Sequence, residues 1–364
     1  MRSDQAIPSG GARVLAFNDL DGWAADDPAP ALSAFRASCV RILALPGDAP
    51  IDGKGYDVSR YGRAGDWRPA CKAAANVKPG AGPARAYFET WFVPVRFESE
   101  TDTGGLFTGY FEPEMKGALT EHGPYRTPIL ALPPAFAAAR ANGEALPTRA
   151  EIEDMMGSGK IVKRYALVWL ADPVDAFFLH VQGSGRIRLE DGQIVRLAFA
   201  AKNNRPYTSI GKLLIERGAI PRDEVSMQTI RAWLEAHPGE IRPLLRQNES
   251  YIFFKRLDGV DPMLGPPGAG RVNLTPGRSI AVDRRFHPLG TLFWLDTRAP
   301  DPHGTGTEPL KRLMVAQDTG TAIRGRQRAD IFWGAGADAA EIAGRMKSEG
   351  ELIALVPKDL AARR

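Results

Sequence analysis

Three aspartates in the last third of the chain are candidates for proton transfer. Asp283 ends the apolar run 279–282, Asp318 follows the run 313–316 after one residue, and Asp330 opens the run 330–334. A carboxyl group at the end of an apolar strand is partly desolvated, which raises its pKa and lets it protonate a leaving oxygen near neutral pH. From the residues alone, an alternative is that these acids cap turns or pair with Arg284, Arg285 or Arg324.

The three aspartates belong to a series of short motifs that follow one another along the chain. They are FTGYFEP at 107–113, VQGSG at 181–185, YTSIG at 207–211, NESYIFF at 248–254, TPGRSIAVD at 275–283, QDTG at 317–320 and DI at 330–331. With these motifs, residues 100–357 resemble the membrane-bound lytic murein transglycosylase A (MltA) family with its C-terminal three-aspartate (3D) domain. One departure is Thr321, which stands where the family has a second glycine after Asp-Thr-Gly.

The resemblance implies a fold that is mainly β with some helices. Its parts are a double-psi β-barrel catalytic domain, expected at 1–104 with 246–364, and a second β-rich domain inserted at 105–245. A groove between the two domains is expected to hold the substrate. The residue pattern agrees with the insertion, since a strand-rich block lies between two regions of different pattern.

By position in the motifs, the resemblance implies Asp330 as the catalytic acid and base, with Asp318 as a second catalytic carboxylate. A nearby carboxylate raises the proton affinity of its neighbour. Asp283 matches the third aspartate, which is expected to shape the surrounding loops. The substrate-binding candidates are Thr108, Gly109, Tyr110, Gln182, Ser184, Asn248, Tyr251 and Asp283, with core packing or turn support as the alternative for each of the polar and aromatic members.

The implied activity is that of a peptidoglycan lytic exotransglycosylase. Asp330 would protonate the β-1,4 bond between N-acetylmuramic acid and N-acetylglucosamine. As a carboxylate it would then take the proton of the muramic C6 hydroxyl, which closes a 1,6-anhydro ring. Two alternatives stay open: an inverting glycoside hydrolase that uses water, and a non-catalytic cell-wall binding protein.

Composition and charge fit an ordinary globular protein. The 364 residues are 44% hydrophobic and 25% charged, and this length favours two domains. The net charge of +4 is spread along the chain without a zinc-finger, RNA-recognition or P-loop pattern, which argues against nucleic-acid binding. The expected partners are peptidoglycan strands and cell-wall synthesis or hydrolysis complexes, with the chain itself a monomer.

The two cysteines, Cys39 and Cys71, form either one disulfide or two buried thiols. Neither has a Cys or His at metal-ligand spacing, and the five histidines are scattered, so we expect no metal and no organic cofactor. No apolar run is long enough to span a membrane. The first residues lack a secretory apolar segment and an early lipid-bearing Cys, so we expect a cytoplasmic chain or one written without its leader. The resemblance implies the periplasm, with outer-membrane association.

Hydrophobic periodicity predicts the elements that must position these residues. Helices are expected at 31–45, within 84–100, and at 209–218, 224–236 and 338–347. The residues 190–193 form a hairpin turn signal. Strands are expected at 106–111, 165–170, 176–181, 187–189, 194–197, 253–254, 280–283, 291–295, 313–316 and 352–356.

Overall fold

The computed structural model describes residues 6–7, 11–52, 56–97, 104–158, 162–259, 261–320 and 322–363. Thr321, the departure from the motif pattern, lies outside these residues. The chain divides into two compact units: unit 1 contains residues 1–111 and 261–364, and unit 2 contains residues 112–260. The predicted insert, 105–245, differs from unit 2 at both edges. It includes strand β4 (Gly105–Glu112), which pairs within unit 1, and it omits strand β10 (Ile252–Arg256), which pairs within unit 2.

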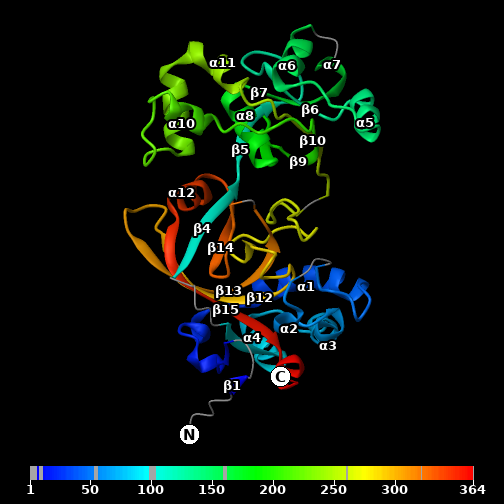
Figure 1. Cartoon of the computed structure of the whole chain (residues 1–364), viewed down its shortest axis with the longest axis vertical. Coiled ribbons are helices and arrows are strands. Elements are labelled where there is room, and N and C mark those ends of the chain that lie inside the picture. Colours follow the sequence, from blue (N-terminus) through cyan, green and yellow to red (C-terminus); the bar gives the residue numbers. More distant parts are fainter. Residues whose placement is uncertain are drawn as a thin grey trace. The chain divides into compact units, whose positions relative to one another are not determined.

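Unit 1 is built on a closed barrel of six strands (Figure 1). They pair in the order β15-β12-β13-β11-β14-β4, and β4 pairs again with β15 to close the ring. Strand β15 serves two neighbours: its first half pairs with β4 and its second half with β3, from which β2 and β1 extend the sheet. The strands are β1 (Ala6–Ile7), β2 (Ala12–Val14), β3 (Phe92–Phe97), β4 (Gly105–Glu112), β11 (Ser279–Val282), β12 (Leu292–Pro300), β13 (Thr307–Asp318), β14 (Arg328–Ala335) and β15 (Lys347–Pro357).

Helices from the first hundred residues pack on this barrel (Figure 1). One hydrophobic core joins Phe35 and Phe88 of these helices to Trp294 and Leu355 of the barrel strands. The helices of unit 1 are η1 (Phe17–Asp19), η2 (Trp23–Ala25), α1 (Ala29–Ala44), α2 (Val58–Tyr61), α3 (Ala64–Ala74), α4 (Ala81–Trp91), α12 (Ala337–Arg345) and α13 (Lys358–Ala362).

A disulfide between Cys39 and Cys71 links α1 to α3, with the two Cα atoms 5.2 Å apart. Of the two alternatives for the cysteines, the structure therefore has the disulfide.

Unit 2 contains a six-stranded sheet with the order β10-β9-β8-β5-β7-β6. The predicted turn at 190–193 is confirmed, since β8 and β9 pair antiparallel on either side of it. The strands are β5 (Glu114–Ala118), β6 (Thr127–Leu130), β7 (Ala166–Leu170), β8 (Ser184–Arg188), β9 (Ile194–Lys202) and β10 (Ile252–Arg256). The helices are α5 (Pro134–Ala141), α6 (Arg149–Gly157), α7 (Val162–Tyr165), α8 (Pro173–Gln182), α9 (Ile210–Glu216), α10 (Met227–Ala236), η3 (Pro238–Glu240) and α11 (Ile241–Leu245).

The prediction of a strand at 176–181 is wrong, because this apolar segment lies in helix α8. The Asp172 side chain accepts a hydrogen bond from Val174 N at 2.8 Å, and Pro173 occupies the first turn. Gly183 ends the helix in the left-handed conformation, with φ of 77°. These are ordinary helix start and stop signals, and they override the strand preference of the apolar run.

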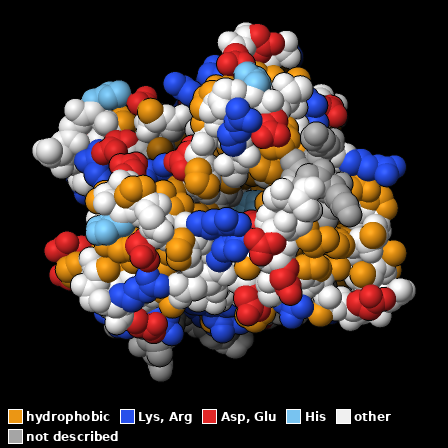
Figure 2. Space-filling model, turned by 90° about the horizontal axis from the view of Figure 1, so that it is seen from above, with side chains coloured by type: hydrophobic (Ala, Val, Ile, Leu, Met, Phe, Trp, Pro, Cys, Tyr) orange, Lys and Arg blue, Asp and Glu red, His pale blue; other side chains and the backbone are white. Residues whose placement is uncertain are grey.

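The predicted fold class is confirmed in its main features: the protein is mainly β, with a domain built on a closed six-stranded barrel and a second β-rich domain inserted into it. Basic and acidic side chains are interspersed on the face shown in Figure 2. Within the described ranges, no helix has the length and apolarity needed to cross a membrane, and no cluster of three or more His, Cys, Asp or Glu could hold a metal ion.

Candidate active site

Two of the three predicted aspartates flank one residue of the barrel. Ala281 on β11 pairs with Asp318 on β13 and with Asp330 on β14. Paired residues of neighbouring strands project to the same face of a sheet, so the two carboxyl groups lie on one face, on either side of Ala281. Asp330 lies inside β14, two residues after its start, rather than opening the strand as predicted.

Strand β4 presents two hydroxyl groups to these carboxylates. Thr108 Oγ1 donates to Asp330 Oδ1 at 2.6 Å, and Tyr110 OH donates to Asp318 Oδ2 at 2.9 Å. Alternate residues of a strand share a face, which explains why Thr108 and Tyr110 both reach the aspartates. Gly109 faces the other way, where a Cβ atom would approach Trp333 Nε1 to 2.6 Å, so this position has no room for a side chain.

The surroundings of Asp330 favour its protonated form. Burial raises the pKa of Asp330, and the negative charge of Asp318 raises it further. The hydrogen bond from Thr108 and the positive charge of Arg328 act in the opposite direction, and the net direction is upward. Arg328 Nη2 donates to Thr108 Oγ1 at 2.9 Å, so its link to Asp330 runs through the threonine hydroxyl.

The Asp318 carboxylate accepts two hydrogen bonds, one at each oxygen. Its Oδ2 accepts from Tyr110, and its Oδ1 accepts from Ala269 N at 2.9 Å. Burial, reinforced by the charge of Asp318, holds the pKa of Tyr110 well above its usual value, so this hydroxyl remains a donor. Asp318 is therefore fixed in orientation beside Asp330.

Asp283 is held apart from this pair by its own contacts. Its side chain is buried, and its carboxylate accepts hydrogen bonds from Arg285 N, from the Arg285 guanidinium and from Gly325 N. The hydrogen bonds of Arg285 and Gly325 outweigh burial and lower the pKa of Asp283 to about 2. Asp283 thus ties the Arg285 side chain to Gly325, which is a pairing that the sequence offered as an alternative; a loop-shaping or substrate-binding role of Asp283 remains a prediction.

The remaining predicted site residues lie in unit 2. Gln182 is exposed at the end of α8, and Ser184 is half-buried at the start of β8. Asn248 and Tyr251 are buried; Asn248 Oδ1 accepts from Thr208 N and Ser250 N. A contact of these four residues with sugar remains a prediction.

The arrangement in unit 1 is suited to proton transfer. It combines a carboxyl group with a raised pKa, a second carboxylate, and two hydroxyl donors that fix both in place. Arg328 was missed by the sequence reasoning. The signal was present, since Arg328 stands two residues before Asp330 on the same strand and therefore on the same face.

Comparisons with known proteins give consistent matches. The family model described as "MltA specific insert domain" matches residues 106–255, and the "3D domain" model matches residues 278–356. The curated membrane-bound lytic murein transglycosylase A of Escherichia coli K12 is 38% identical over 255 residues, which are 68% of this chain. The match spans 65% of that relative's length, slightly under two thirds.

Solved structures match over nearly the whole chain. The lytic transglycosylase LtgG of Burkholderia pseudomallei is 38% identical, with 98% of each chain covered and a TM-score of 0.63. The structure of Escherichia coli MltA with bound chitohexaose is 29% identical, covers 98% of this chain and 95% of that one, and has a TM-score of 0.67.

Proposed function

This chain belongs to the membrane-bound lytic murein transglycosylase A family, and we propose that it is a peptidoglycan lytic transglycosylase. The bond cleaved is the β-1,4 bond between N-acetylmuramic acid and N-acetylglucosamine, and the product carries a 1,6-anhydromuramic end. The chitohexaose bound to the Escherichia coli relative supports a glycan as the substrate class.

The observation that carries this proposal is the environment of Asp330. Its carboxyl group has a pKa raised by burial and by Asp318, which favours the protonated form that a general acid needs. Asp330 gives its proton to the glycosidic oxygen as the bond to C1 breaks. The resulting carboxylate then takes the proton of the C6 hydroxyl as that oxygen attacks C1, so one residue serves as acid and then as base.

The other groups of the site orient rather than exchange protons. Thr108 holds the Asp330 carboxyl, and Tyr110 holds Asp318 beside it. Asp318 raises the proton affinity of Asp330 and stabilises positive charge that develops at C1. Gln182, Ser184, Asn248 and Tyr251 are proposed sugar contacts by motif position, and Asp283 supports the loop between β13 and β14.

Product analysis in ¹⁸O-labelled water tests the reaction type. Digestion of purified sacculi should give 1,6-anhydromuramic ends without solvent oxygen, because the C6 hydroxyl is the nucleophile. Label at the new muramic C1 would identify an inverting hydrolase instead. Intact sacculi after prolonged incubation would identify a cell-wall binding protein.

We further propose a periplasmic location with outer-membrane association, as the name of the relatives suggests. The polymer occurs in that compartment, and the disulfide between Cys39 and Cys71 suits an oxidising one. The proposed partners are peptidoglycan strands and cell-wall complexes, with the enzyme acting as a monomer. Fractionation of cells that express the full protein, followed by non-reducing electrophoresis, tests location and disulfide together.

A further inference from the structure

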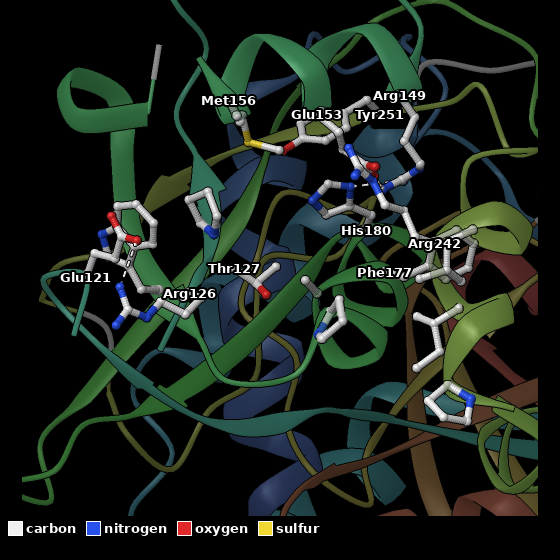
Figure 3. A pocket seen from close by; sticks show the side chains of 18 residues that line it. Glu121, Arg126, Thr127, Arg149, Glu153, Met156, Phe177, His180, Arg242 and Tyr251 are labelled. Atoms are coloured by element: carbon white, nitrogen blue, oxygen red, sulfur yellow. Dashed lines mark hydrogen bonds and ion pairs between the residues drawn. The ribbon is translucent and has the colours of Figure 1, made fainter. Parts of the chain in front are cut away.

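A cavity of about 640 Å³ lies within unit 2 (Figure 3). All residues that line it belong to unit 2, whereas Thr108, Tyr110, Asp318 and Asp330 belong to unit 1. Its size is in the range of small-molecule sites. The buried aromatic side chains of Trp169, Phe177 and Tyr251 form part of its lining.

Arg149 and His180 form a fixed polar pair in the lining of the cavity. Arg149 Nη2 donates to Ser250 O at 2.9 Å, and it lies 3.1 Å from His180 Nδ1. The Arg149 guanidinium also lies over the ring of Phe177, and Glu153 offsets its charge at 3.8 Å. The hydrogen-bonding groups of Arg149 are therefore engaged within the protein, and its contact with His180 determines which ring nitrogen of that histidine carries the proton.

The contact with Arg149 fixes the tautomer of His180. A guanidinium group only donates hydrogen bonds, so His180 Nδ1 accepts and the ring proton is on Nε2. Burial and the charge of Arg149 hold the pKa of His180 well below its usual value, so the ring is neutral. The Nε2–H group has no hydrogen-bond acceptor among the described residues. It is not fully buried either, and His180 lines the cavity. The side chain is 7% exposed, so this is a nearly buried donor that faces an open space.

The two ends of the cavity differ in charge. His180 is neutral and lies among aromatic rings, with its ring centroid 4.3 Å from that of Tyr251. Arg126, in contrast, is 64% exposed, and it is oriented by Gly123 O and by Glu121. In the view of Figure 3, His180 lies between Arg126 and Arg242, which is also exposed. The inner part thus suits a neutral acceptor, and the outer part suits an anion.

We propose that this cavity binds a short N-acylated peptide with a free carboxylate. A peptide amide carbonyl accepts from His180 Nε2–H, the aromatic side chains cover the peptide side chains, and Arg126 pairs with the carboxylate. A sugar fits this lining less well, because each of its hydroxyl groups needs a partner and the inner wall is mostly apolar. The proposal goes beyond the proposed glycan cleavage, which requires no peptide contact.

Binding is measured on the full-length protein with ¹⁵N-labelled histidine. The probes are N-acetyl-D-alanyl-D-alanine, its C-terminal amide and N,N′-diacetylchitobiose. We expect the His180 ring signals to show an Nε2–H tautomer and to shift saturably with the acidic peptide, with a Kd on the order of 0.1–1 mM. The His180→Phe variant identifies these signals by their loss.

Two variants test the two ends of the cavity. His180→Phe keeps an aromatic ring but removes the donor, and it should weaken the peptide about fivefold. Arg126→Gln should weaken the acidic peptide about threefold to fivefold and leave the amide unchanged. Arg217→Gln is the matched control, because Arg217 also pairs with a glutamate at the surface of unit 2 but does not line the cavity.

The Asp330→Asn protein separates this inference from the proposed function. It should bind the peptide as the wild type does, even where cleavage is lost. Three outcomes would each overturn the proposal. The acid and the amide could bind equally, only diacetylchitobiose could give a saturable shift, or the His180 signals could respond to none of the probes. An Nδ1–H tautomer would overturn it as well.

Discussion

Each unit of the protein contains a carboxyl group whose pKa is raised, and the two groups differ in their burial and in their partners: Glu112 is fully buried, whereas Asp330 is half-buried. In unit 2, Glu112 is 1% exposed and accepts a hydrogen bond from Arg196 Nη2 at 2.7 Å. In unit 1, Asp330 accepts a hydrogen bond from the neutral hydroxyl of Thr108, and it faces the like charge of Asp318. Burial is the largest cause of the raised pKa in both cases.

The difference separates a structural acid from a reactive one. Glu112 has its countercharge in direct contact, so its carboxyl group is tied to Arg196 in the protein interior. The cation near Asp330, Arg328, donates to Thr108 rather than to the carboxylate. Asp330 can therefore exchange a proton with a bound molecule without breaking a salt bridge. Desolvation alone does not identify a catalytic acid; desolvation without a bonded countercharge is the more specific sign.

The largest expected effect is the loss of activity in Asp330→Asn. The amide keeps the shape of the side chain but cannot exchange the proton, and the same carboxyl is proposed to serve both steps. We expect turnover on sacculi, measured by release of anhydromuropeptides, to fall by about 10³–10⁴-fold or more. Asp318→Asn should cost about tenfold, or about 1.4 kcal/mol. Asp338→Asn, an exposed acid of unit 1, is the control and should keep wild-type activity. An active Asp330→Asn enzyme would mean that another group is the acid.

The second prediction concerns the stability of the paired carboxyl. Glu112→Gln removes the carboxylate that Arg196 Nη2 contacts at 2.7 Å in the protein interior, so the free energy of unfolding should fall by about 3–5 kcal/mol. Denaturant unfolding, with ¹⁵N signals of unit 2 as the probe, measures this change. The double variant Glu112→Leu/Arg196→Met should recover part of the loss, because neither charge remains. A Glu112→Gln protein as stable as the wild type would remove the distinction between the two carboxyls.

The sequence predicted Asp318 and Asp330 as candidate catalytic residues because the motifs that contain them are recognisable by residue type and by their order along the chain. Asp330 and Asp318 come together because β13 and β14 both pair with β11, and the run of apolar residues before Asp318 already indicated a strand. Hydrophobic periodicity does not predict which strands pair when they are far apart in the sequence. For this reason the hydrogen bonds of Thr108 and Tyr110 to the aspartates were not predicted, although both residues were candidates.

The cavity of unit 2 was not predicted at all, for a physical reason. Its polar pair joins His180 of α8, a segment predicted as a strand, to Arg149 at the start of α6. An isolated histidine in an apolar run is usually a core residue, and only the three-dimensional contact with Arg149 reveals a fixed donor. Local patterns therefore predicted the elements and the acids, while contacts between distant segments determine the rest.

The third prediction tests how Arg328 acts on Asp330. Its positive charge lowers the pKa of Asp330, so Arg328→Gln should raise that pKa further. A general acid is active while it is protonated, so the alkaline limb of the kcat/KM profile should move to higher pH, with a loss of at most about tenfold at neutral pH. The matched control is Arg298→Gln, because Arg298 also donates to a threonine hydroxyl, that of Thr307, but at an exposed position. If the alkaline limb of the kcat/KM profile did not move, Arg328 would have a structural role only and would not set the pKa of Asp330.

The smallest expected effect has the opposite sign to that of Glu112→Gln. Because the folded state raises the pKa of Asp330 above the usual 3.8, the native protein binds this proton more tightly than the unfolded chain does. Stability from this group is complete below pH 3.8, and it is lost as the pH rises from there through the folded-state pKa. Above pH 3.8 the wild type therefore loses the stability that this proton gave to the folded state, whereas Asp330→Asn, which does not titrate, keeps its stability. We expect the variant to melt about 2–4 °C higher at pH 7, which corresponds to about 1 kcal/mol, with the difference shrinking toward pH 4. Calorimetry of both proteins across this range measures the effect. A variant that melts below the wild type at pH 7 would mean that neighbouring groups depend on the Asp330 carboxyl group, as Arg196 depends on Glu112.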